Sequence, residues 1–315
     1  MNYKPNRNVD PSLRLPEPFI RWAGGKRWLA AGLGYAIRQR LAQTQGRYIE
    51  PFIGGGAVFL ATGIRSGIIS DLNSELVEAW RIVRDQPEAL VDMIASWPVE
   101  QAFYNQMRLA QPETALERAA RFIWLNRCCY GGIHRTNRKG QFNVAFGGGS
   151  RTPAHMIENR LIETASLALQ SADLSIEACD FETSIDRAGP GDLVYCDPAY
   201  TEAASSGEER RFVRYGQIVF TWSDQERLAL ACRRAAARKA CVIVSTGAEP
   251  EITELYGKAS RIALSRTKSI GKSAGDASFH GESIFVLDPM ADVASWLPYL
   301  PEDACLEAEG ARLAA

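Results

Sequence analysis

The tetrapeptide Asp197-Pro198-Ala199-Tyr200 combines groups that could activate an aromatic amine. Such an amine is a poor nucleophile because its lone pair is delocalised into the ring. The Asp197 carboxylate and the backbone carbonyl of Pro198 could each accept one N–H, which would free the lone pair for attack on a sulfonium methyl group. The Tyr200 ring could stack on the base that carries the amine. Asp-Pro is also a common turn former, so this tetrapeptide alone leaves a structural role open.

A glycine-rich turn lies upstream, at Phe52-Ile53-Gly54-Gly55-Gly56. Missing side chains would let a ligand lie against the backbone there. A dinucleotide fingerprint needs a glycine three places after Gly56, but Phe59 stands there, so we expect a nucleoside without a pyrophosphate. Asp71, at the tip of the next expected strand, could accept hydrogen bonds from both ribose hydroxyls. It could instead cap the following helix, a role that Asn73 could also fill.

The segment from Phe19 to Lys26 places an aromatic residue, two glycines and a cation close together. The Lys26 ammonium is suited to a ligand carboxylate, and the Trp22 ring could flank an adenine or a sulfonium. The alternative is a solvated lysine beside a tryptophan of the core.

A basic stretch departs from the average charge of the chain. The stretch runs from residue 118 to residue 151 and contains no Asp or Glu. Its seven basic side chains are Arg118, Arg121, Arg127, Arg135, Arg138, Lys139 and Arg151. Within it, residues 126–143 mix Arg and Lys for phosphates with Asn, Gln and Arg for base edges, and Tyr130 could act as a wedge. His134 is more typical of a polar loop residue than of a metal ligand, because no second ligand stands at a zinc-like spacing.

Strands and helices must position these segments. Strands are expected near residues 48–52, 68–70, 174–176, 192–196, 241–245 and 283–287. Helices are expected between several of them, one starting with a capping box from Ser223 to Glu226. The alternation predicts an α/β fold with a doubly wound, mostly parallel sheet, whose carboxyl edge carries the chemistry.

The alternation stops between about residues 87 and 160, which an inserted, mainly helical domain explains best. We expect a flexible arm over 1–15, a discontinuous core over 16–86 and 161–290, and a C-terminal tail over 291–315 whose end is a frayed helix.

The composition places bounds on the class of protein. The 315 residues are 46% hydrophobic with a formal net charge of −1, so only the local basic stretch indicates nucleic acid. No apolar run approaches the roughly 20 residues that cross a bilayer, and the N-terminal residues are not signal-like, so a cytoplasmic location is expected. The seven cysteines form no C-x-x-C pair and are expected to be mostly buried free thiols.

Together, the segments from Pro18 to about Pro289 resemble the adenine-specific DNA methyltransferases of the Dam type. The matching runs are Trp22 to Lys26 (N-terminal donor motif), Glu50 to Gly56 (glycine loop), Asp71 to Asn73 (ribose turn), Leu125 to Val144 (DNA-recognition segment), Cys179 to Phe181 (donor-adenine motif) and Asp197 to Tyr200, in place of the catalytic Asp-Pro-Pro-Tyr.

The resemblance implies transfer of a methyl group from S-adenosylmethionine to the N6 amine of an adenine flipped out of double-stranded DNA, by a monomer without a metal. The catalytic residues would be Asp197, Pro198 and Tyr200. The donor would be bound by Trp22, Lys26, Phe52, Gly54, Gly56, Asp71, Asp180 and Phe181. DNA would be bound by Asn126, Arg127, Tyr130, Arg135, Asn137, Arg138, Lys139 and Asn143, with residues 87–160 as the target-recognition domain.

Three positions depart from that family's pattern: Ala199 replaces its second proline, Gly131 stands where relatives often carry an Asn, and the loop after Lys268 is less basic. Two alternatives stay open. One is a methyltransferase that acts on RNA or on a protein amide. The other is a DNA-binding subunit that binds the donor but has lost turnover.

Overall fold

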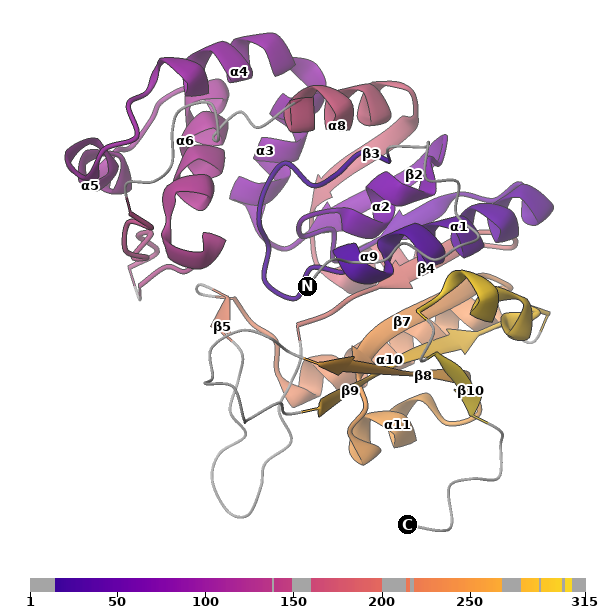
Figure 1. Cartoon of the computed structure of the whole chain (residues 1–315). Coiled ribbons are helices and arrows are strands. Elements are labelled where there is room, and N and C mark those ends of the chain that lie inside the picture. Colours follow the sequence, from indigo (N-terminus) through magenta and orange to yellow (C-terminus); the bar gives the residue numbers. More distant parts are fainter. Residues whose placement is uncertain are drawn as a thin grey trace, which may run out of the picture.

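The computed structural model describes residues 15–137, 139–148, 160–199, 214–215, 218–267, 279–288, 290–301 and 304–307. Within these ranges an eight-stranded sheet runs through the molecule, and a separate two-stranded ribbon is formed by β5 and β6 (Figure 1). The strands are β1 (Tyr48–Glu50), β2 (Ser66–Asp71), β3 (Asp173–Ala178), β4 (Leu193–Cys196), β5 (Arg214–Tyr215), β6 (Ile218–Val219), β7 (Cys241–Gly247), β8 (Ser260–Thr267), β9 (Phe279–Leu287) and β10 (Cys305–Glu307).

The strand order in the large sheet is β10-β8-β9-β7-β4-β1-β2-β3. The strands from β7 to β3 are parallel to their neighbours, whereas β9 is antiparallel to β7 and to β8, and β10 is antiparallel to β8. The predicted mixed α/β fold with a mostly parallel sheet is therefore confirmed. Strands β2 and β3 are added on one side of β1, and β4 is added on its other side, so the order in which strands are added reverses between β1 and β4. In parallel sheets, ligands bind at this switch point, beyond the carboxyl ends of the strands.

Helices cover both faces of the sheet (Figure 1). Their bounds are α1 (Arg27–Thr44), α2 (Ala57–Thr62), α3 (Ser74–Asp85), α4 (Pro87–Ser96), α5 (Gln101–Leu109), α6 (Ala115–Cys128), η1 (Tyr130–Gly132), α8 (Leu161–Gln170), α9 (Phe181–Ile185), α10 (Trp222–Ala237), α11 (Pro250–Tyr256) and η3 (Val293–Tyr299).

The two faces of the sheet belong to two hydrophobic clusters, as β4 illustrates. Leu193 and Tyr195 pack with α1, α2 and α3, whereas Val194 and Cys196 pack with α9, α10 and α11. Successive side chains of a strand point to opposite faces, so a strand covered on both sides is apolar throughout. This explains why β4 and β7 were recognisable from short apolar runs.

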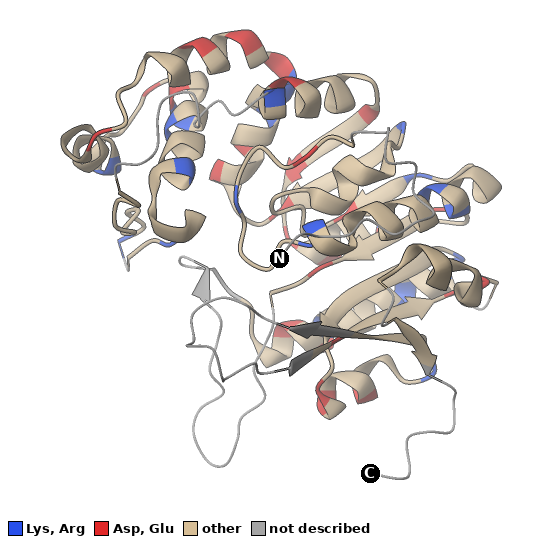
Figure 2. Cartoon of the chain, in the orientation of Figure 1, with Lys and Arg blue, Asp and Glu red and all other residues tan. Residues whose placement is uncertain are grey.

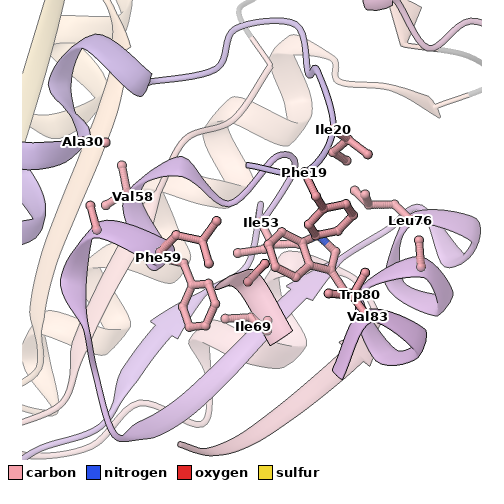
Figure 3. Packing of buried hydrophobic residues seen from close by; sticks show 14 of the residues in the cluster. Phe19, Ile20, Ala30, Ile53, Val58, Phe59, Ile69, Leu76, Trp80 and Val83 are labelled. Carbon is pink, nitrogen blue, oxygen red and sulfur yellow. The ribbon is translucent and has the colours of Figure 1, made fainter. Parts of the chain in front are cut away.

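The core on the α1 to α3 side contains a cluster of aromatic rings. The rings of Phe19 and Trp80 meet edge to face at 4.7 Å, and the ring of Phe59 lies 6.0 Å from Trp80 (Figure 3). Trp80 is fully buried on α3. The N-terminal segment before α1 is therefore anchored in the core through Phe19.

The described part of residues 87–160 contains the helices α4, α5 and α6, followed by η1, a loop and a small hairpin. Helices α4 and α6 pack on α3 and on each other, α5 packs on α6, and α8 leads back to β3 (Figure 1). Buried side chains of these helices, including Tyr104 and Trp124, belong to the same hydrophobic cluster as α1 to α3. In the described part of the chain, these helices therefore share the hydrophobic cluster of α1 to α3.

Two predicted elements differ from the structure. The capping box of α10 is formed by Thr221 and Asp224, because the Thr221 hydroxyl accepts from the Asp224 N–H and the Asp224 carboxylate accepts from the Thr221 N–H. The expected cap at Ser223 is wrong, since Ser223 lies inside the first turn. The expected C-terminal tail is also wrong in part: η3 packs on α1 with Val293 and Trp296 buried, and β10 pairs with β8 where a frayed helix was expected.

The cysteines are unpaired, as predicted, and all except Cys179 and Cys305 are buried. No helix in the described part of the chain is long and apolar enough to cross a membrane.

Candidate active site

A cavity of about 680 Å³ lies at the switch point, beyond the carboxyl ends of β1, β2 and β4. Its volume is typical of small-molecule sites. It brings together Trp22, Lys26, Phe52, Gly54, Gly56, Asp71, Asp180, Phe181, Asp197 and Pro198, all of which were singled out from the sequence.

The glycine turn after β1 is shaped by neighbouring rings. Gly54 and Gly56 have φ angles of +45° and +68°, in the left-handed region that favours glycine. A Cβ on Gly54 would lie 2.7 Å from the ring of Trp22, and one on Gly56 would lie 2.5 Å from the ring of Trp80. The Trp80 indole N–H also donates to the carbonyl of Gly54 at 3.1 Å. Glycine is therefore required at both positions.

Asp71 ends β2 beside this turn. Its carboxylate accepts hydrogen bonds from the backbone N–H of Gly54 at 3.1 Å and of Asn73 at 3.0 Å. Burial raises the pKa of Asp71 to about 6, and the backbone N–H groups oppose that rise. The side chain of Asn73, not Asp71, caps α3 by accepting from the N–H of Leu76. The alternative role of Asp71, as the cap of this helix, is therefore performed by Asn73.

Aromatic rings form another wall of the cavity. The rings of Phe52 and Phe181 are stacked with centroids 5.4 Å apart, and the Arg227 guanidinium lies 4.8 Å from the centre of the Phe181 ring. Asp180 caps α9 and also accepts a hydrogen bond from Arg227 at 3.0 Å. The Asp180 carboxylate therefore helps to fix both the start of α9 and the Arg227 guanidinium that lies over the Phe181 ring.

The Asp197 carboxylate follows β4 and is 19% exposed at the cavity. The Lys26 ammonium lies 2.6 Å from an Asp197 oxygen, 3.0 Å from Glu282 and 3.2 Å from the Gly24 carbonyl. The pKa of Asp197 is raised to about 6. Burial is the main cause, the Glu282 carboxylate adds to the rise, and the Lys26 ammonium opposes it. Lys26 was expected to bind a ligand carboxylate. In this structure its ammonium instead lies between two carboxylates of the protein.

Pro198 and Ala199 line the cavity beyond Asp197. Tyr200, for which base stacking was predicted, lies outside the described residues. Within the part of the chain that the structure describes, no three His, Cys, Asp or Glu residues are grouped so as to hold a metal ion.

Residues 22–270 match the family described as D12 class N6 adenine-specific DNA methyltransferases. The chain belongs to this family. As a D12 class enzyme, it methylates DNA at the N6 position of adenine. The match includes every cavity segment named above from Trp22 to Arg227, as well as the inserted helices.

Several curated proteins are similar to this methyltransferase. The Type II methyltransferase M1.LlaDCHI of Lactococcus lactis subsp. cremoris is 32% identical over 247 residues, which cover 76% of this chain and 84% of the relative. The DNA adenine methylase of Escherichia coli strain K12 is 30% identical over 263 residues, covering 82% and 90%. The DNA adenine methylase of Vibrio cholerae strain O395 is 26% identical over 284 residues, covering 88% and 98%.

The segment predicted to contact DNA in this methyltransferase divides into a buried part and an exposed part. Asn126 is fully buried, and its side chain is bonded to backbone groups of Arg21 and Gly132. Arg127 is buried as well. Both lie on α6 where it packs against its neighbours, so the predicted direct DNA contacts of these two side chains are not available in this structure.

The exposed part begins after α6. Tyr130 is 68% exposed, and the backbone bonds between Arg135 and Asn143 form a small hairpin. The Arg135 guanidinium donates to the Asn143 side chain at 2.9 Å. Asn137 shapes the tip, because its side-chain oxygen accepts from the backbone N–H groups of Lys139 and Gln141.

The basic charge of this segment is only partly free to meet DNA. Arg118 is paired with Glu78, and Arg121 donates to the carbonyls of Met107 and Arg108. Lys139 is exposed at the hairpin, whereas Arg138 and Arg151 lie outside the described residues. Figure 2 shows basic residues along α6 and the loop beyond it, and acidic residues on α3 and α4.

Two acidic residues of the methyltransferase site were missed as functional candidates. Glu282, on β9, contacts Lys26 and has no local sequence signal, because its strand is antiparallel and distant from the motifs. Glu50 ends β1, lines the cavity and accepts a hydrogen bond from the Tyr48 hydroxyl at 2.8 Å. Burial raises the pKa of Glu50 well above its usual range. Its position before Pro51 at the end of a strand was the available signal.

Proposed function

We propose that the protein transfers the methyl group of S-adenosylmethionine to the N6 amine of an adenine that it flips out of double-stranded DNA. The observation that carries this proposal is one cavity that joins a nucleoside-sized pocket to the Asp197-Pro198 end of β4. Membership of the D12 class supports the reaction.

The residues of the cavity fit the proposed donor. Asp71 ends β2 with a carboxylate that accepts ribose hydroxyls, and Phe52 and Phe181 provide apolar ring faces for an adenine. The turn at Gly54 and Gly56 leaves the backbone open to the ligand. When bound, S-adenosylmethionine supplies an electrophilic methyl group on its sulfonium.

Asp197 and Pro198 provide the acceptors for the target amine. The ionised Asp197 carboxylate accepts one N–H, and the Pro198 carbonyl accepts the other, so the nitrogen lone pair becomes available. The Lys26 ammonium favours the ionised form of Asp197 and fixes one of its oxygens. Lys26 is thus proposed to position the catalytic carboxylate rather than to bind the donor carboxylate. Tyr200 remains proposed to stack on the flipped base.

DNA is proposed to meet the surface formed by Tyr130 and the hairpin over residues 135–143. Tyr130 is exposed and suited to occupy the space of the flipped base. Arg135, Asn137 and Lys139 lie on the hairpin, and Arg138 and Asn143 complete the proposed contact set. The enzyme is further proposed to act as a monomer in the cytoplasm, and residues 87–160 are proposed to form its target-recognition region.

The test is a methylation assay with purified protein, isotopically labelled S-adenosylmethionine and duplex DNA that contains every short sequence context. Digestion and mass spectrometry should find labelled N6-methyladenine, and sequencing of the product should find one recognition site. Asp197→Ala should abolish the label. Label on RNA or protein alone would favour the alternative substrates, and donor binding without any transfer would favour a subunit that has lost turnover.

A further inference from the structure

The buried amide of Asn126 connects the inserted helices to the N-terminal segment. Its Oδ1 accepts from the backbone N–H of Arg21 at 2.9 Å, and its Nδ2 donates to the Arg21 carbonyl at 2.8 Å. The same Nδ2 lies 3.2 Å from the carbonyl of Gly132, in the loop that follows α6. One side chain therefore fixes both backbone groups of Arg21 and the loop over residues 130–133, here called the recognition loop.

Gly132 brings this loop against the same residue. A Cβ on Gly132 would lie 2.5 Å from side-chain carbons of Arg21, and its φ of +69° favours glycine. The loop and Arg21 are thus in direct contact, with no room for an intervening side chain.

The segment from Phe19 to Lys26, here called the strap, leads from this contact into the donor cavity. The ring of Trp22, the next residue after Arg21, covers Gly54 and stacks on His134 with centroids 5.6 Å apart. His134 itself follows the recognition loop and is buried. At the other end of the strap, Lys26 holds Asp197.

We propose that Asn126 is a positioning residue that couples occupation of the DNA-recognition loop to the geometry of the donor cavity through the strap. The inference rests on the proposed function. A shift of the loop on DNA must either carry Arg21 with it or break hydrogen bonds of the fully buried Asn126 amide, and leaving a buried amide unpaired is costly. Movement of Arg21 in turn displaces Trp22 from the glycine turn. DNA at the loop therefore changes the affinity for the donor through this contact, and the donor changes the affinity for DNA by the same factor, since such coupling is reciprocal.

The experiment measures the dissociation constant of S-adenosylmethionine by calorimetry, with and without a saturating duplex that contains the recognition site. Asn126→Ala should weaken donor binding about tenfold, a loss expected for buried hydrogen bonds. It should also bring the ratio of the two constants close to one. Donor affinity and coupling that both match the parent protein would overturn the proposal.

The matched control is Tyr104→Phe. The Tyr104 hydroxyl is buried in the same helical segment and donates to the Val144 carbonyl at 2.9 Å, without a contact to the strap. This variant should lose stability but keep the donor affinity of the parent, whereas equal donor losses in both variants would show that Asn126 acts only through stability. If Asn126→Ala does not fold, Gly132→Ala replaces it, because the added Cβ pushes on Arg21 while Asn126 stays in place.

The two proposals fail in different ways. Loss of coupling with intact adenine methylation in the parent supports both. A parent protein that methylates DNA while Asn126→Ala behaves normally would overturn the coupling alone. A parent that never methylates DNA would overturn the proposed function.

Discussion

Asp197 is the residue whose protonation should set the pH dependence of the reaction. In the proposed mechanism it must be ionised to accept an N–H from the adenine amine, and burial raises its pKa to about 6. We expect the single-turnover rate at saturating donor to rise with pH through about 6 and to level off above it. Glu282→Gln removes a neighbouring negative charge, so the midpoint should move to lower pH. A midpoint that does not move in E282Q would argue that another group controls the profile.

Asp71 should matter for donor binding more than for folding. Asp71→Ala removes a carboxylate that is proposed to accept ribose hydroxyls, so donor affinity should fall at least about tenfold. The control is Asn73→Ala, which removes the cap of α3 and should cost about 1 kcal/mol of stability with little effect on donor affinity. Calorimetry on both folded variants checks this, and an unchanged donor affinity in D71A would remove Asp71 from the pocket.

Residues placed by the end of a strand were predictable, and residues placed by distant partners were not. Asp71 ends the strand β2 and Asp197 directly follows β4, so short sequence patterns locate both at the carboxyl edge. The positions of Asn126 and Lys26 depend on partners 105 and 171 residues away in the chain. Both side chains are polar, so the sequence suggested that they contact a ligand. The neighbouring residues in the sequence do not reveal that Lys26 is paired with carboxylates of the protein, or that Asn126 is bonded to backbone groups of the protein.

The hairpin over residues 135–143 should carry the salt dependence of DNA binding. Lys139 is exposed on it, whereas Arg118 on α6 is already paired with Glu78. Lys139→Gln should therefore flatten the slope of log affinity against log salt by up to about one unit, because one fewer counterion is released. Arg118→Gln, which removes the same charge, should leave the slope close to that of the parent. Equal slopes for the parent and K139Q, measured by fluorescence anisotropy, would place the phosphate contacts elsewhere.

Elements were predictable where local propensity and tertiary pairing agree. The apolar runs of β4 and β7 are typical of buried strands, and both were expected. At the C-terminal end the two conflict: the Ala and Glu-rich composition favours a helix, but Cys305–Glu307 pairs with β8 as an edge strand. Strand β8 was missed because, among its described side chains, only Ile262 and Leu264 are buried, and Arg261 and Ala263 beside them give a weak apolar signal.

The stability of the fold should depend on the segment after β9, which was expected to be a C-terminal tail. Trp296 is buried where η3 packs on α1. Trp296→Ala should lower the free energy of unfolding by about 3–5 kcal/mol, because it leaves a cavity in the core. Met290→Ala is the control, since Met290 is 82% exposed and its loss should change stability little. Urea unfolding of the two variants checks this, and equal stabilities would show that η3 packs too weakly to support the core.

At the scale of the molecule, the alternation of strands and helices was sufficient to predict the parallel sheet and the interruption after α3. It was not sufficient to predict that the inserted helices share a hydrophobic cluster with α1 to α3. Amphipathic patterns show that a helix has an apolar face, but not which element covers it. That choice depends on contacts such as those between α3 and α6, which are distant in the chain.

The ion pairs of Lys26 have a consequence for how the protein is made. Lys26 leaves the ribosome early, but its partners Asp197 and Glu282 are synthesised much later. Burying an ammonium without its carboxylates is strongly unfavourable, so a nascent chain that ends before β4 cannot close the strap in its final position. Contacts between such distant residues also slow folding, because a long loop must close first. The proposed active site is therefore assembled only after β9 has been translated, and products of synthesis interrupted before β9 should bind the methyl donor less well than the chain that includes it.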